Sequence, residues 1–278
     1  MTSTAPTPVL VWIHGGALMG GGRGSMQPVL RDLLTQAGYT QISIDYLLAP
    51  ETKLPGIIDD VQDAFRWVRK EARKQFNLNP DRLGVMGGSA GGYLTLMTGF
   101  CVQPRPRALV SFYGYGDIAG PWYREPDPFY CSKPMVPKEE AYASVGTAAL
   151  AEVPPQNNRF RFYLYCRQHG LWPNEVLGKD PHTHPKAFDP YCPVRNVTQA
   201  YPPVLLLHGT ADTDVPFQQS VDMAAALEKA GVPHELVTIP DGPHGFDGGV
   251  KPDELESAEQ SPAARSLLKV LAFVTKYV

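Results

Sequence analysis

The sequence lacks the marks of several large classes of protein. No run of five charges of one sign occurs, and the net charge is only −3, so neither nucleic acid nor an anionic membrane is an expected partner. The apolar stretch near the N-terminus is about six residues long, far short of a signal peptide or a membrane-spanning helix. We therefore expect a cytoplasmic protein that binds no membrane.

Cysteine is also scarce. The chain has four cysteines, at positions 101, 131, 166 and 192, and no CxxC or Cys/His pair with the spacing of a metal site. This arrangement is typical of reduced thiols in a cytosolic protein and argues against a disulfide framework or a zinc site. We expect no bound metal.

Proline, in contrast, is abundant, with 28 residues, about twice the usual share of roughly 5%. More than half of them lie in residues 104–203, among many aromatic residues. Compact domains seldom contain a structureless loop of that length, so we expect a folded insertion with short helices. We assign residues 117–200 to a lid or cap, and residues 1–116 and 201–278 to the core. An excursion without a role in binding is the alternative.

Strand-like runs alternate with helix-like runs along the rest of the chain, which indicates an α/β protein with a mostly parallel sheet covered by helices. The apolar residues of segment 56–76 recur at helical spacing. Strands are expected at 8–14, 39–46, 82–87, 108–114, 203–209 and 234–240, and helices at 25–38, 56–76, 217–230, 257–277 and directly after Ser89.

One glycine-rich stretch has the pattern of a catalytic serine. In "RLGVMGGSAGGYLTLM", Ser89 lies in a G-x-S-x-G motif between an expected strand and an expected helix, which is the context that this motif requires. The flanking glycines let neighbouring segments pass a strained turn without collision, and the hydroxyl stands at the positive end of the helix. We predict that Ser89 is a nucleophile, with a plain glycine-rich turn as the alternative.

A serine hydroxyl needs a base, and the base needs a carboxylate to orient it. His244 lies in "IPDGPHGFD" at the end of the last expected strand, and "LLLHGTADTDVP" ends the preceding strand with Asp212 and Asp214. Open α/β sheets place their sites at the carboxyl ends of the strands, so we predict His244 as the base and one of the two aspartates as its partner. We expect His208 to pack or hydrogen-bond structurally.

Five motifs in order carry a resemblance: "HGG" after the first strand, "DYLLAPE", "GGSAGG", "HGTADTDVP" and "HGF". With them the chain resembles an α/β-hydrolase of the hormone-sensitive-lipase-like esterase group, and it is also similar to feruloyl-esterase-like members. The resemblance implies a serine hydrolase that cleaves carboxylic esters of small to medium acyl groups through an acyl-enzyme, without a cofactor. The family's H-G-x-x-D pattern assigns the acid to Asp212. Asp214 is the alternative acid, or else caps the loop or forms a salt bridge.

The first glycine cluster, "LVWIHGGALMGGG", follows a strand and suits a close approach of backbone to a ligand. It contains neither phosphate-binding pattern, G-x-x-x-x-G-K-[ST] or G-x-G-x-x-G. The resemblance instead implies that the N–H groups of Gly15, Gly16 and Ala90 form an oxyanion hole for the carbonyl attacked by Ser89. One such donor is worth roughly 3–4 kcal/mol of barrier.

The sequence departs from the family pattern in three places. Ala17 follows "HGG" where a third glycine is frequent, and Leu47 stands where an arginine is usual. The "HGG" motif begins at residue 14, although this fold normally has two strands before it. We therefore expect an α/β-hydrolase fold with helices on both faces of the sheet and without the usual N-terminal strand pair. That absence would leave a strand edge on which a homodimer could pair.

Two other functions fit the same motifs. A thioesterase, acyltransferase or cyclase acting on a biosynthetic intermediate would use the same triad, so the expected partner is a small-molecule ester or thioester. A hydrolase-like binding protein without turnover is the third hypothesis, and the complete triad argues against it. Aromatic residues of the insertion are candidates to line the pocket, with packing against the core as the alternative for each: Trp122, Tyr123, Phe129, Tyr130 and Trp172.

Overall fold

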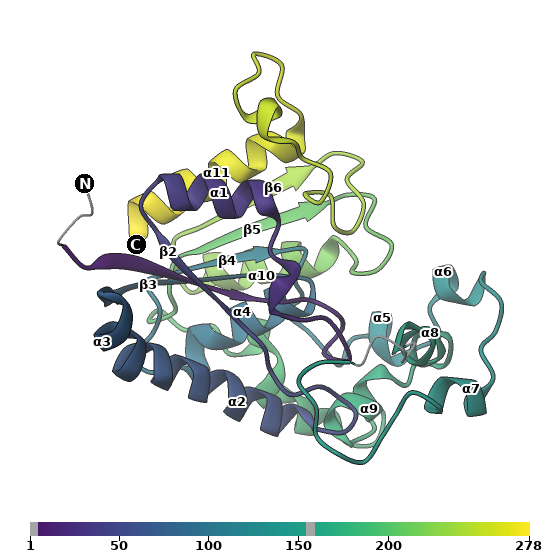
Figure 1. Ribbon diagram of the computed structural model, residues 1–278. Helices are drawn as coiled ribbons and strands as arrows, with labels where there is room; N and C mark the ends of the chain where they lie inside the picture. Colours follow the sequence, from purple (N-terminus) through teal and green to yellow (C-terminus); the bar gives the residue numbers. More distant parts are fainter. Residues whose placement is uncertain (1–4, 154–158) are drawn as a thin grey trace.

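A computed structural model describes residues 5–153 and 159–278. Within them, six parallel strands form one sheet in the order β2-β1-β3-β4-β5-β6 (Figure 1). The expected strands are confirmed, with ends that differ by a few residues. Their bounds are Thr7–Ile13 for β1, Thr40–Ile44 for β2, Leu78–Gly88 for β3, Ala108–Phe112 for β4, Val204–Gly209 for β5 and His234–Ile239 for β6.

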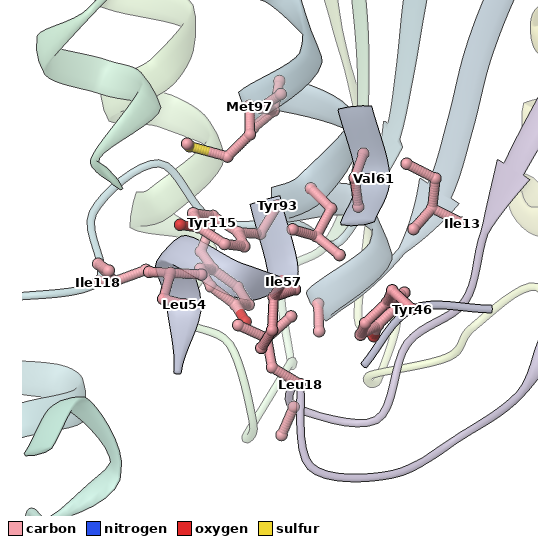
Figure 2. Packing of buried hydrophobic residues seen from close by; sticks show 14 of the residues in the cluster. Ile13, Leu18, Tyr46, Leu54, Ile57, Val61, Tyr93, Met97, Tyr115 and Ile118 are labelled. Carbon is pink, nitrogen blue, oxygen red and sulfur yellow. The ribbon is translucent and has the colours of Figure 1, made fainter. Parts of the chain in front are cut away.

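The sheet lies between two helical layers (Figure 1). Along β1 the side chains alternate between two apolar clusters, because successive residues of a strand point to opposite faces. Val9 and Val11 belong to one cluster, and Leu10 and Trp12 belong to the other. Figure 2 shows the first cluster, in which Ile13 lies among side chains from helices on that face.

The helices follow the expected segments. The first cluster is covered by α2 (Leu54–Trp67), α4 (Ala90–Cys101) and α10 (Gln218–Lys229), and the second by α1 (Pro28–Gln36) and α11 (Pro262–Tyr277). The single helix expected at 56–76 is instead α2, a π-helical turn η2 (Val68–Ala72) and α3 (Arg73–Phe76). Short 3₁₀ turns occur in two loops, η1 (Arg23–Ser25) and η5 (Pro252–Leu255).

The insertion between β4 and β5 is folded into short helices. Figure 1 shows α5–α9 gathered to the right of the sheet, on the side toward which the strand arrows point. Proline fits the first turn of a helix, where its missing N–H has no partner to lose, and several of these helices begin in this way. Their bounds are Pro121–Arg124 for α5, Pro128–Cys131 for α6, Lys138–Tyr142 for α7, Arg159–His169 for α8, Trp172–Leu177 for α9, Pro185–Tyr191 for η3 and Pro193–Arg195 for η4.

In the described part of the chain no strand precedes β1, as expected. β2 and β6 are its two edges. A homodimer stays a prediction. Among the described helices, none combines the length and the apolar character needed to cross a bilayer.

Candidate active site

Ser89 occupies the sharp turn between β3 and α4. Its φ of 57° and ψ of −121° lie in a region that a residue with a side chain seldom adopts. The neighbouring glycines are required by space, because a Cβ on Gly91 would overlap the carbonyl oxygen of Ile13 and one on Gly87 would overlap that of Gly91. The turn is held by the Ser89 N–H, which donates to the Phe112 carbonyl at 2.9 Å. The strand–turn–helix context predicted for G-x-S-x-G is therefore present.

Asp212 is a buried carboxylate surrounded by donors. Its Oδ2 lies 2.7 Å from His244 Nδ1 and 3.2 Å from His208 Nε2. Its Oδ1 accepts from two backbone N–H groups, those of Asp214 at 2.8 Å and Val215 at 2.9 Å. Burial alone would raise the pKa of this carboxyl group, but the hydrogen bonds from the two histidines bring the pKa far below its ordinary value. Asp212 is therefore ionised and able to orient a histidine.

His244 receives opposing influences on its pKa. Burial lowers the pKa, whereas the hydrogen bond to Asp212 and the negative charges of Asp214, Asp212 and Asp247 raise it, and the net shift is upward. The imidazole ring lies 4.6 Å from the ring of Tyr113, measured between centroids. The Tyr113 hydroxyl donates to Asp247 Oδ1 at 2.8 Å. The ring is therefore held by the hydrogen bond of one nitrogen to Asp212 and by a tilted ring contact with Tyr113.

Asp214 forms contacts different from those of Asp212. Its Oδ1 accepts from the hydroxyl of Tyr130 at 2.7 Å, from the hydroxyl of Tyr163, and from Arg167 Nη1 at 2.9 Å. Its Oδ2 lies 3.5 Å from His244 Nε2. The structure therefore places Asp212 at Nδ1 of His244, and it places Asp214 in the salt bridge that was one of its expected explanations.

His208 lies in the core beneath this site. It is fully buried, and its Nδ1 lies 2.7 Å from Ser220 Oγ while its Nε2 lies 3.0 Å from the Val215 carbonyl oxygen. These contacts confirm the expected structural role. Together with the 3.2 Å approach to Asp212 they fix the loop that carries this carboxylate.

The loop after β1 turns tightly against Ser89. Gly16 has a φ of 106°, and its carbonyl accepts from the N–H groups of Met19 at 2.9 Å and Gly20 at 3.0 Å. A Cβ on Gly15 would lie 2.9 Å from the Gly88 carbonyl oxygen and 3.2 Å from Ser89 Cβ. Within residues 5–153 and 159–278, the N–H groups of Gly15 and Gly16 have no acceptor. Among the described residues they are therefore donors without an acceptor, and they lie beside the serine.

Further residues extend or support the loop beside Ser89. The N–H of Ala90 is at the first position of α4, where a helix provides no acceptor of its own. Ala17 takes a φ of 56°, and its carbonyl oxygen accepts from Trp172 Nε1 at 2.9 Å. His14 supports the loop from below, because its buried ring stacks on that of Tyr46 at 4.2 Å. The support from His14 and Trp172 was missed by sequence reasoning.

A cavity of about 630 Å³ opens over these groups, which is within the range of small-molecule sites. Four predicted site residues line it: Gly15, Gly16, Ser89 and His244. Ala90 and the Asp212 side chain lie behind its wall and are fully buried. The remaining wall comes from the core and the insertion, and includes Trp12, Met19, Tyr113, Tyr130, Val153, Arg159, Phe160, Tyr163 and Asp214.

Four aromatic residues predicted for the pocket lie elsewhere. Trp122 stacks on Tyr123 at 3.7 Å, and Tyr123 stacks on Trp172 at 4.0 Å, so these three rings pack the insertion against the core. Phe129 is 40% exposed, and the Lys133 ammonium lies over its ring. Packing between insertion and core, the alternative left open by the sequence, describes the three stacked rings.

The insertion residues that do line the cavity come mainly from α8. Arg159 and Tyr163 are four residues apart on this helix, so they share one face, and Phe160 lies beside them. That spacing was the signal in the sequence that could have indicated them. Tyr130, also a candidate from the sequence, lines the cavity from α6. In the part of the chain that the structure describes, no cluster of three His, Cys, Asp or Glu side chains is arranged to hold a metal.

Known proteins with similar sequences include hydrolases and much larger enzymes. A family model described as "alpha/beta hydrolase fold" matches residues 10–248. The chain is 27% identical to the esterase LipC of Mycobacterium tuberculosis, over 95% of this chain and 58% of LipC. It is also 27% identical to the non-reducing polyketide synthase ausA of Aspergillus calidoustus, over 87% of this chain and 12% of that protein. The chain therefore spans less than two thirds of LipC and a small part of the synthase.

A solved structure agrees with the fold. The chain superimposes on an alpha/beta hydrolase superfamily protein from Enterococcus faecalis with a TM-score of 0.75 and 24% identity. The superposition covers 99% of this chain and 93% of that protein. At this identity the likeness concerns the architecture, which includes the sheet and the helical layers described above.

Proposed function

This chain belongs to the α/β-hydrolase family, and on that basis we propose that it is a serine hydrolase that cleaves carboxylic esters of small to medium acyl groups through an acyl-enzyme. One arrangement carries the proposal. Ser89, on its strained turn, and His244, hydrogen-bonded to the buried Asp212, line the same cavity as Gly15 and Gly16, whose N–H groups find no acceptor in the described part of the chain. The likeness to the esterase LipC supports ester hydrolysis as the class of reaction.

The first half of the proposed reaction forms the acyl-enzyme. Neutral His244 takes the hydroxyl proton of Ser89 at Nε2 while Oγ attacks the ester carbonyl carbon, and the π electrons move onto the carbonyl oxygen. The N–H groups of Gly15, Gly16 and Ala90 donate to this oxyanion, and the loss of one such donor typically costs about 10²–10³ in kcat. The carbon–oxygen bond to the alcohol then breaks, and the alcohol takes the proton from Nε2.

The second half releases the acid. A water molecule gives a proton to His244 Nε2 and attacks the acyl carbon, after which the bond to Ser89 Oγ breaks and Oγ regains the proton. Asp212 accepts from Nδ1–H throughout and stabilises the imidazolium without taking its proton. The low pKa of this carboxyl group supports that division of roles.

We assign the insertion, residues 117–200, to a cap that shapes the acyl pocket. Tyr130, Phe160 and Tyr163 contribute aromatic surface to the cavity wall. Burial of a methylene group is worth about 0.8 kcal/mol, so such a wall discriminates between acyl chains of different length. A volume of about 630 Å³ suits small to medium acyl groups.

A serine-reactive fluorophosphonate probe and p-nitrophenyl acetate test the proposal. We expect the wild-type protein to be labelled and active, and Ser89→Ala to lose the label and about 10⁶-fold in kcat while its circular dichroism is unchanged. Ser257→Ala, at an exposed position, is the matched control and should retain both. A folded Ser89→Ala protein with most of its activity would refute the nucleophile, and a wild-type protein without label or turnover would indicate a non-catalytic binding protein.

A second candidate function changes the bond or the acceptor. A thioesterase, acyltransferase or cyclase on a biosynthetic intermediate would use the same triad, and the likeness to a non-reducing polyketide synthase favours this candidate. Matched oxygen esters and thioesters of one acyl chain, assayed with and without an added alcohol, separate the two. Hydrolysis that exceeds transfer and is faster with the oxygen ester supports the esterase, whereas a preference for the thioester, or transfer that exceeds hydrolysis, supports the second candidate.

A further inference from the structure

Two carboxylates flank the imidazole of His244, one beside each ring nitrogen. Asp212 Oδ2 lies 2.7 Å from Nδ1, and Asp214 Oδ2 lies 3.5 Å from Nε2. Nε2 is the nitrogen that exchanges a proton with Ser89 in the proposed reaction. An ionised carboxylate accepts hydrogen bonds and donates none, so each aspartate favours a proton on the nitrogen it faces.

The insertion fixes the position of the second carboxylate. Tyr130 and Tyr163 donate their hydroxyl protons to Asp214 Oδ1, and Arg167 Nη1 donates to the same oxygen at 2.9 Å and to the Asp214 carbonyl oxygen at 3.0 Å. Burial raises the pKa of both tyrosines well above the ordinary range, so they remain donors. With Oδ1 occupied by three donors, Oδ2 is the oxygen left to face His244.

Arg167 is itself held rigidly. Its side chain is 1% exposed, and its Nη2 donates to Asp127 Oδ2 at 2.6 Å. The guanidinium carbon lies 4.6 Å from the ring centroid of Tyr130 and 4.9 Å from that of Tyr123, distances typical of cation–π contacts. Because Arg167 bonds Oδ1, it anchors the Asp214 carboxylate on the side away from His244.

The charged and titratable groups around His244 come from four parts of the fold. The loop after β5 provides two carboxylates, the loop after β6 provides a buried one, and the end of β4 provides a tyrosine. The insertion provides two tyrosines and, behind Asp214, one guanidinium. These groups are Asp212, Asp214, Asp247, Tyr113, Tyr130, Tyr163 and Arg167.

The geometry points to Asp214 as a positioning residue, held by the insertion, that forms an ion pair with the resting His244 on its Nε2 side. In the resting protein both ring nitrogens then face a carboxylate, which favours the imidazolium. His244 acts as a base only after Nε2 has lost its proton, which leaves a lone pair to accept the hydroxyl hydrogen of Ser89. The insertion therefore influences the proton transfer, in addition to forming part of the pocket wall. This inference rests on the proposed role of His244 as the base.

The pH dependence of kcat/KM for p-nitrophenyl acetate tests the inference. Asp214→Asn removes a negative charge beside Nε2, so the imidazolium is less favoured and the acidic limb moves to lower pH. At a pH on that limb, kcat/KM is expressed as a fraction of its plateau value for each protein. This fraction should be roughly tenfold larger for the variant than for the wild-type protein, which is the effect expected of one charge at this distance. Its plateau should stay within about tenfold of wild type, whereas Asp212→Asn should lose about 10⁴-fold.

Asp127→Asn is the matched control. It removes the same charge from the other side of Arg167, away from His244, so the acidic limb should not move. Asp214→Glu restores a carboxylate, and we expect it to return the limb toward the wild-type position. An Asp214→Asn limb that coincides with that of wild type, or an equal movement in Asp127→Asn, would overturn the inference.

A second variant covers the case in which Asp214→Asn does not fold. The double change Tyr130→Phe, Tyr163→Phe keeps both rings but removes two donors from Asp214 Oδ1, so the carboxylate attracts Nε2–H more strongly. The acidic limb should then move in the opposite direction, to higher pH, and an unchanged limb would contradict the inference. If Ser89→Ala leaves activity intact, the proposed function fails. If only the limbs fail to move, the proposed function stands without this role of Asp214.

Discussion

The core and the insertion position their functional groups in different ways. In the core, the proposed nucleophile and the proposed oxyanion donors depend on backbone turns, such as Ser89 at a φ of 57° and Gly16 at a φ of 106°. In the insertion, the groups near the site are held in place by side-chain contacts, such as the hydrogen bonds that Arg167 donates to Asp127 and Asp214. The core thus tolerates little change at glycine, and the insertion tolerates little change at its buried ion pairs.

The difference has a physical origin. A tight turn is built by adjacent residues, and only glycine avoids a steric penalty where a Cβ would overlap a neighbouring chain. A buried ion pair is built by residues far apart in the chain and depends on desolvation and geometry. Substitutions at the core turns should therefore reduce the reaction rate while the fold is retained. Substitutions at the buried ion pairs of the insertion should reduce stability.

Of the three effects that distinguish the two regions, the largest is on stability, in the insertion. Arg167→Met leaves the carboxylates of Asp127 and Asp214 without their buried cation, and breaking a buried pair in this way typically costs about 3–5 kcal/mol. The free energy of unfolding in urea measures it. Arg161→Met is the matched control, since the Arg161–Glu140 pair lies at the surface and should contribute far less. Equal losses for the two variants would show that the buried network does not stabilise the insertion.

The next effect is on rate, in the core. A Cβ added by Gly15→Ala would crowd the Gly88 carbonyl oxygen and Ser89, which displaces an oxyanion donor, so kcat should fall by about 10²–10³. Gly24→Ala is the control, because nothing lies within 4 Å of its added Cβ. Steady-state kinetics with circular dichroism on both proteins make the measurement. A Gly15→Ala protein with wild-type kcat would argue against the oxyanion hole.

The smallest effect is on selectivity. Phe160→Ala removes an apolar part of the cavity wall. Each methylene of the acyl chain that loses its contact costs about 0.8 kcal/mol, so the preference between octanoate and acetate esters should change several-fold. Phe129→Ala is matched in residue type and region, but Phe129 does not line the cavity, so its profile should equal that of wild type. Ratios of kcat/KM across acetate, butyrate and octanoate esters provide the comparison. Identical chain-length profiles for the two variants would contradict a role of the insertion in selectivity.

The sheet, its helices and the folded insertion were all predictable from the sequence. Apolar runs such as those of β4 and β5 become strands that are buried along their whole length, and such runs are typical of parallel strands covered on both faces. The π-helical turn η2 was not predictable, because the apolar spacing of residues 56–76 continues through it. Periodicity reports which face is buried and not how each turn is hydrogen-bonded.

The site was predictable where chemistry depends on local spacing. Ser89, Gly15 and His244 were indicated by short motifs, and the structure brings them to one cavity. The pocket wall was not predictable, since the selection of Tyr163 over Trp172 depends on how α8 and α9 pack. Trp172 is fully buried, and no residue next to it in the chain signals this.

The hydrogen bond from Trp172 to the Ala17 carbonyl joins the two regions at the turn that presents the proposed oxyanion donors. This hydrogen bond matters for any attempt to replace the insertion with that of a related protein. A foreign insertion grafted onto this core would have to supply an equivalent donor at that carbonyl, however well it shaped the acyl pocket. Trp172 does not line the cavity, so a graft designed from the pocket outward would omit it. Compatibility between the insertion and the core would in this way depend on a residue that lies outside the cavity wall.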